Sequence, residues 1–144
     1  MAGTRRSIAV AALASATLTL GTAEVAGAAT TLTAHLSGKA EVPQAGNGSG
    51  SARITLKGRK RRVCFSITLK NVGTAMAGHI HKGGKTVAGP IVVPLFAEPT
   101  TEPSGCVSAK RSVIRAIKRH PRRYYVNVHT AQYPGGAARG QLHR

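Results

Sequence analysis

The stretch AGHIHKG, residues 77–83, places two histidines one residue apart in a segment with the pattern of a β-strand. Side chains alternate between the two faces of a strand, so His79 and His81 share one face and Ile80 points into the core. A second stretch, YYVNVHT at residues 124–130, alternates in the same way and puts His129 on the face opposite its two valines. If the two strands are neighbours, three of the six histidines converge on one outward face.

The N-terminal 28 residues have the features of a secretory signal peptide. Arg5 and Arg6 precede an uncharged apolar run over residues 8–20, and AGA at residues 26–28 fits a small-x-small cleavage site. A single membrane anchor is the alternative, but the run is shorter than the ~20 residues that a span needs. We therefore predict a signal peptide over residues 1–28 and one exported domain over residues 29–144, secreted or associated with the cell envelope, with no transmembrane segment after cleavage.

The predicted exported domain is strongly basic. It carries 19 of the 21 Lys and Arg residues and three acids, Glu41, Glu98 and Glu102, which gives a net charge of +16. This charge favours an anionic cell-envelope polymer as partner, with another extracellular protein as a further candidate; the alternative is a solvated surface that only keeps the protein soluble. Two Phe, three Tyr and no Trp offer little for base stacking, which argues against nucleic acid. The candidate anion-binding residues are Lys57, Arg59, Lys60, Arg61, Arg62, Arg115, Arg119, Arg122, Arg123 and Arg139.

Two cysteines, Cys64 and Cys106, lie in the predicted exported part. Cysteines in an oxidising compartment usually pair, and a bridge here would stabilise a small domain by roughly 2–4 kcal/mol. Two free thiols or a soft-metal site are the alternatives.

Alternating apolar residues predict strands over residues 30–36, 51–56, 62–69, 75–82, 124–130 and 138–142. Residues 90–96 are apolar but contain Pro90 and Pro94, which indicates an edge strand or a kinked strand, and residues 106–107 are expected to form a short strand. A helix is expected over residues 109–119, with Ser108 as its N-cap. These elements predict an all-β fold: a small antiparallel β-sandwich or Greek-key barrel with one short helix.

Several motifs occur in a fixed order: LSG (36–38), EVP (41–43), HIHKG (79–83), GP (89–90), YYVNVHT (124–130), PG (134–135) and RGQL (139–142). Together they resemble the CHRD domain, named after its repeats in chordin, in the single-domain form found in many exported bacterial proteins. The resemblance implies a secreted all-β domain of the immunoglobulin-like or superoxide-dismutase-like kind, and no settled activity. Ala137 and Ala138 stand where the family tends to have an acidic and an aliphatic residue, so any role of that carboxylate is absent here.

The three converging histidines suggest a metal site. Neutral imidazoles suit copper, zinc or nickel, and three of them can hold a metal with one position open. Such a copper site could in principle cycle between redox states, as in the dismutases, but the chain has no Asp to supply the carboxylate of their zinc site. The alternative is that His79, His81 and His129 only form hydrogen bonds that pin the sheet.

Hydrolytic chemistry finds little support in the sequence. There is no Gly-x-Ser-x-Gly elbow, the three carboxylates are scattered over loops, and bridged cysteines are poor nucleophiles. We therefore expect a non-catalytic extracellular binding module of unknown ligand, with copper or zinc binding through the three histidines as the alternative function.

Overall fold

The computed structural model describes residues 28–144, so the predicted signal peptide lies outside the described residues except for its last position. The strands are β1 Thr30–Ser37, β2 Ser49–Lys57, β3 Arg62–Lys70, β4 Ala77–Lys82, β5 Ile91–Phe96, β6 Ser104–Ser108, β7 Tyr124–His129 and β8 Ala138–Gln141. One α-helix, α1 Arg111–Arg119, and two 3₁₀ turns, η1 Gly38–Ala40 and η2 Pro121–Arg123, complete the elements.

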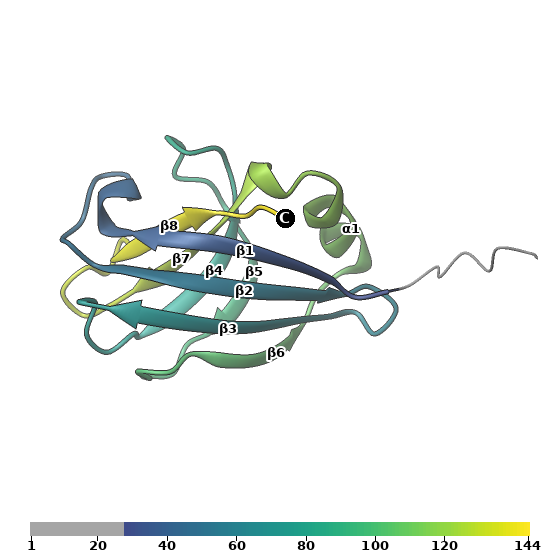
Figure 1. Ribbon diagram of the computed structural model, residues 1–144, viewed down its shortest axis with the longest axis horizontal. Coiled ribbons are helices and arrows are strands. Elements are labelled where there is room, and N and C mark those ends of the chain that lie inside the picture. Colours follow the sequence, from purple (N-terminus) through teal and green to yellow (C-terminus); the bar gives the residue numbers. More distant parts are fainter. Residues whose placement is uncertain (1–27) are drawn as a thin grey trace, which may run out of the picture.

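All eight strands belong to one antiparallel sheet in the order β5-β4-β7-β8-β1-β2-β3-β6. The sheet curls so that β1, β2, β3 and β6 face β4, β5 and β7 across the interior (Figure 1). The two end strands, β5 and β6, contact each other, so the sheet is nearly closed into a barrel. The predicted all-β class, with one helix, is confirmed.

The core fills the inside of this curled sheet. Leu32, Ile54, Val63, Ile80 and Val126 are fully buried, one from each of five strands, because alternate side chains of every strand point inward. Ile114 and Ile117 of α1 join the same cluster, so the helix covers one end of the barrel (Figure 1).

The predicted start of the helix was wrong. Ser108 is not the N-cap but the last residue of β6, where it pairs with Arg62, and the chain stays extended for one more step because the Ala109 N–H donates to the Arg61 carbonyl. The helix begins at Arg111, and its N-cap, Lys110, makes no side-chain capping bond. A pairing strand therefore prevailed over the local capping preference of serine.

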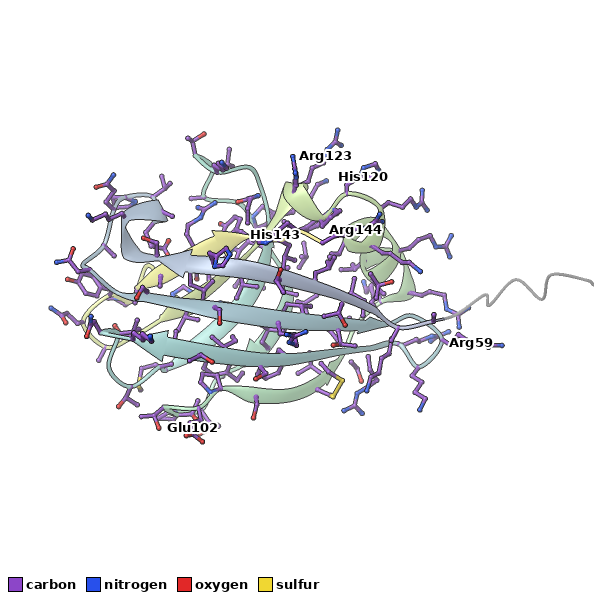
Figure 2. The ribbon with its side chains drawn as sticks, viewed as in Figure 1. Arg59, Glu102, His120, Arg123, His143 and Arg144 are labelled. Atoms are coloured by element: carbon purple, nitrogen blue, oxygen red, sulfur yellow. A yellow bond between two sulfur atoms is a disulfide. The ribbon has the colours of Figure 1, made fainter. Side chains whose placement is uncertain are left out.

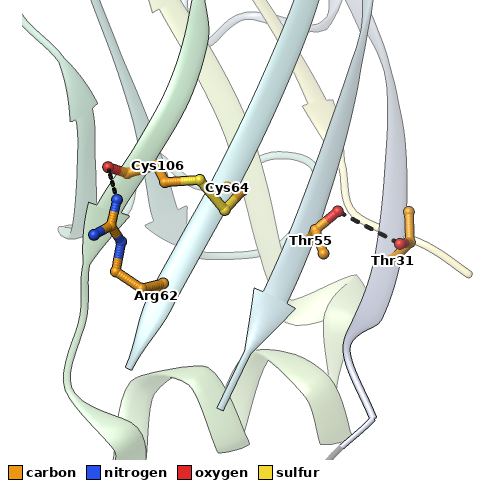
Figure 3. The surroundings of a disulfide bond; sticks show 5 residues. All are labelled: Thr31, Thr55, Arg62, Cys64 and Cys106. Carbon is orange, nitrogen blue, oxygen red and sulfur yellow. Dashed lines mark hydrogen bonds between the residues drawn. A yellow bond between two sulfur atoms is a disulfide. The ribbon is translucent and has the colours of Figure 1, made fainter. Parts of the chain in front are cut away.

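Cys64 and Cys106 form the predicted disulfide (Figure 3). They lie directly opposite each other on β3 and β6, and the Arg62 guanidinium donates a 2.9 Å hydrogen bond to the Cys106 carbonyl beside the bridge. The disulfide thus fastens an end strand of the sheet to its only neighbour in the strand order. Within residues 28–144, no helix has the length and apolar character needed to cross a membrane.

Candidate metal centre

The three histidines come from two adjacent strands. β4 supplies His79 and His81, and β7 supplies His129 as its last residue; antiparallel pairing sets His79 opposite Asn127 and His81 opposite Tyr125. Because the side-chain period of a strand is two, all three imidazoles lie on the face away from the core. The predicted convergence is therefore present, but the face is not open: His81 is 9% exposed, and Tyr125 and Asn127 are 3% exposed.

The imidazole nitrogens approach each other closely. One nitrogen from each ring can be chosen so that all three lie within 4.8 Å of one another, and Nδ1 of His79 is 3.0 Å from Nε2 of His129. Ligands about 2.0–2.1 Å from a tetrahedral zinc are separated by about 3.4 Å. The site therefore needs movements of about 1 Å to reach metal-ligand geometry.

Two backbone carbonyls fix which nitrogen faces the cluster. Nδ1 of His81 lies 2.8 Å from the Gly89 carbonyl oxygen, and Nδ1 of His129 lies 2.8 Å from that of Pro134. Because a carbonyl oxygen only accepts, Nδ1 carries the proton in both rings and Nε2 carries the lone pair. Metal-binding histidines usually donate their other nitrogen in this way, which raises the basicity of the ligand nitrogen.

The two Nε2 lone pairs have different partners. Nε2 of His129 accepts from Nδ1 of His79, whereas Nε2 of His81 is buried and has no hydrogen-bond partner among the described residues. A buried nitrogen without a hydrogen-bond partner destabilises the fold, so this lone pair is suited to bind a metal ion. To bind the same ion, His79 must turn or move its proton to Nε2.

A stack of flat groups holds His81 in place. Its ring lies parallel to that of Tyr125, with centroids 4.8 Å apart, and the Arg139 guanidinium covers the other side of the tyrosine at 3.5 Å. The Tyr125 hydroxyl accepts a 3.0 Å hydrogen bond from the Gly89 N–H, so the loop that supplies the His81 acceptor is tied to the same stack. Ala in place of Gly89 would put its Cβ 1.8 Å from the Lys82 carbonyl oxygen.

The environment keeps two of the imidazoles neutral. Burial, followed by the neighbouring His129 and His81, lowers the pKa of His79 from 6.5 to about 4. Burial also lowers the pKa of His81, and the hydrogen bond to Gly89 opposes that effect. Neutral imidazole is the form that binds a metal, so the lowered pKa values keep His79 and His81 in that form as the pH falls below 6.5.

Beyond Asn127 lies a buried carboxyl group. Glu41, 5% exposed, accepts a 2.7 Å hydrogen bond from Nδ2 of Asn127. Burial raises the pKa of Glu41 from 4.5 to about 7, although Arg139 and the Asn127 bond favour its charged form.

The structure separates the predicted anion-binding residues into two groups. Arg139 is 2% exposed, and its two terminal nitrogens donate to the carbonyls of Gly84 and Val87, at 2.9 and 3.1 Å. It therefore sits in the stack beside the histidines and not with the others. The other nine lie at the adjoining ends of β2 and β3 and in the turn between them, on α1 and on η2. Figure 2 labels two of them, Arg59 and Arg123.

Comparison with known proteins identifies the family of the chain. The family model for the CHRD domain matches residues 32–142. The chain belongs to the CHRD domain family. No curated protein and no solved structure matches the chain. CHRD domains are extracellular, and the disulfide fits an oxidising environment.

Sequence reasoning missed the groups that surround the histidines in this CHRD domain. The acceptors at Gly89 and Pro134 are backbone atoms, which no side-chain pattern reveals, yet both lie in the Gly-Pro and Pro-Gly motifs that carry the family resemblance. The buried Glu41–Asn127 pair likewise joins two family motifs, EVP and YVNVH. The ordered set of family motifs was therefore the one feature of the sequence that pointed to these surrounding groups.

Proposed function

We propose that this CHRD domain is an exported, non-catalytic binding module that holds a copper or zinc ion through His79, His81 and His129. One observation carries the proposal: three imidazoles meet, and two of them have Nδ1 donated to a backbone carbonyl so that Nε2 is directed toward the cluster. A purely structural set of histidines would not need a buried, unpartnered Nε2 on His81.

We also propose that the barrel is of the Greek-key kind. The contact between β5 and β6 makes β4, β5 and β6 successive neighbours, and β3 then lies beside β6. Three consecutive neighbouring strands, with the strand from the other end of the segment lying beside the outermost of them, have Greek-key connectivity, here with β3 beside β6. This supports a likeness to the immunoglobulin-like and superoxide-dismutase-like sandwiches.

Dismutase-like chemistry has weaker support than binding. A copper ion on three imidazoles could exchange electrons, and its open position could take a small anion. The sequence, however, has no Asp, and the nearest buried carboxyl group described above, Glu41, is bonded to Asn127. We therefore propose metal binding, and not redox catalysis, as the function of the three histidines.

The test is a calorimetric titration of the purified protein with Cu²⁺ and with Zn²⁺. The site variant carries His79→Ala, His81→Ala and His129→Ala; the matched control replaces the remaining histidines, His35, His120 and His143, by Ala. We expect one ion per chain, bound at micromolar Kd or tighter, by the wild type and the control but not by the site variant. At an ion concentration of 100 times Kd, binding should also add about 2.7 kcal/mol to the stability.

The opposite outcome is equally distinct. If the wild type binds neither ion while the site variant melts at a lower temperature, the histidines are scaffold and the proposal fails. Equal loss of binding in the two triple variants would show nonspecific histidine contacts rather than a site.

A further inference from the structure

The fold joins two basic segments that lie far apart in the sequence. Arg59, from the turn between β2 and β3, lines the same hollow as Arg111, Arg115 and Lys118 of the helix region. A neighbouring hollow is lined by Lys60 and Arg61 of that turn together with Lys110 and Arg111. The turn and the helix therefore form one continuous basic surface.

A third hollow of ≈ 540 Å³ extends this surface past the end of α1. It is lined by Arg119, His120, Pro121, Arg122, Arg123, His143 and Arg144. Figure 2 shows His120, Arg123, His143 and Arg144 near one another beside α1. We call the whole surface the basic end, defined by thirteen residues: Lys57, Arg59, Lys60, Arg61, Arg62, Lys110, Arg111, Arg115, Lys118, Arg119, Arg122, Arg123 and Arg144.

The acids of the described chain lie elsewhere. Glu41 is buried next to Asn127, and Glu98 and Glu102 belong to the loop between β5 and β6. In Figure 2, Glu102 lies at the opposite edge of the molecule from Arg123 and His120. The charges of the basic end are therefore concentrated without nearby carboxylate side chains.

Most of these cationic groups reach into solvent. All members except the half-buried Lys57 are exposed. Within residues 28–144, the two whose side chains donate to a protein carbonyl are Arg62, to Cys106, and Arg144, to Lys118. Nine of the thirteen are arginines, whose planar guanidinium groups match the oxygens of a phosphate group.

We propose that the basic end binds a linear polymer of phosphate groups. A surface that continues across three hollows suits a chain of repeating negative charges better than a single ion. The exposed large apolar side chains of residues 28–144 are Val42, Met76, Val87 and Ile91, so the basic end has none with which to enter a lipid layer. The lining of its three hollows also contains no Phe, Tyr or Trp, the side chains that supply the main stacking platforms for nucleic-acid bases.

The experiment measures binding of long-chain inorganic polyphosphate to the full, purified protein in 50 mM and 200 mM salt, with a chelator present to exclude metal bridging. The site variant carries Arg119→Gln, Arg122→Gln and Arg123→Gln. The matched control carries Lys39→Gln, Arg53→Gln and Lys70→Gln, which removes the same charge from exposed positions outside the basic end. Melting curves establish that all variants are folded.

We expect the site variant to bind at least tenfold more weakly and with a smaller salt dependence, because fewer counterions are released. The control should lose less than threefold. Equal losses in the two variants would overturn the proposal, since net charge alone would then explain the affinity.

Parallel arms separate the possible sources of phosphate. Orthophosphate should bind at least a hundredfold more weakly than polyphosphate at equal phosphate concentration, and vesicles containing phosphatidylglycerol should bind more weakly than polyphosphate. Tighter binding to the vesicles, or to double-stranded DNA, would replace the proposal with a membrane or a nucleic-acid surface. The triple alanine variant of His79, His81 and His129 should bind polyphosphate like the wild type, so the outcome does not depend on the metal site.

Discussion

Replacing Glu41 by Gln should stabilise the protein in alkaline solution and have much less effect in acid. Burial raises the pKa of Glu41 from 4.5 to about 7, although the attraction of Arg139 and the hydrogen bond from Asn127 favour the charged form. A group with a raised folded-state pKa contributes its full stability below its unfolded pKa and loses it as the pH rises through the folded pKa. At about 1.4 kcal/mol for each pH unit between the two values, the ionised carboxylate costs about 3 kcal/mol by pH 8.5.

Glutamine keeps the carbonyl oxygen that accepts from Asn127 but cannot ionise. We compare the free energy of unfolding of Glu41→Gln with that of the wild type by urea unfolding at pH 5 and at pH 8.5. The difference should shift by about 2–3 kcal/mol in favour of the variant from pH 5 to pH 8.5. Glu102→Gln, which removes the same charge from an exposed loop, should show no such gain. If Glu41→Gln destabilises the protein at pH 8.5, the carboxylate is held by its attraction to Arg139 and our reasoning about burial is refuted.

Three further predictions test the site and the bridge. Because of the Cβ clash described above, Gly89→Ala should weaken metal binding at least tenfold in calorimetry. Gly84→Ala, whose added Cβ has nothing within 4 Å, should bind metal like the wild type. Equal affinities of the two variants would show that the carbonyl acceptor of His81 is dispensable. Replacing Cys64 and Cys106 by Ser should lower the free energy of unfolding by about 2–4 kcal/mol in urea titrations, and a loss below about 1 kcal/mol would contradict the expected role of the bridge. His79 has a lowered folded-state pKa, so its stability contribution is present above pH 6.5 and lost as the pH falls toward about 4. Between pH 7 and pH 4.5, the free energy of unfolding should therefore fall by about 1–2 kcal/mol less in His79→Asn than in the wild type. Parallel pH profiles of the two proteins would contradict this prediction.

The alternation of side chains was enough to predict the strands and the face of each strand that carries its histidines, whereas the convergence of the three histidines also required β4 and β7 to be neighbours. Ile80 and Val126 are fully buried where the pattern put them inward, and His79 and His129 lie together on the other face. Alternation says which side a residue faces but not what covers that side. The burial of Tyr125 against His81 depends on a loop whose course no local pattern determines.

Strand order was beyond the reach of the sequence, because pairing between distant segments depends on the whole topology. Arg59 and Arg111, for example, are 52 positions apart in the sequence, and the fold brings them to one hollow. Ser108 shows the same limit on a smaller scale: its capping preference is local, whereas its place in β6 is set by pairing with Arg62, 46 positions earlier in the chain.

Strand β7 has a consequence for how the molecule would be oriented on a surface. It starts directly after Arg123 in the basic end and finishes at His129 in the three-histidine cluster. Six extended residues cover about 20 Å. A molecule attached through its basic end would therefore hold the cluster of His79, His81 and His129 away from the attachment surface, and β7 would act as a rigid spacer that lets both contacts be made at once.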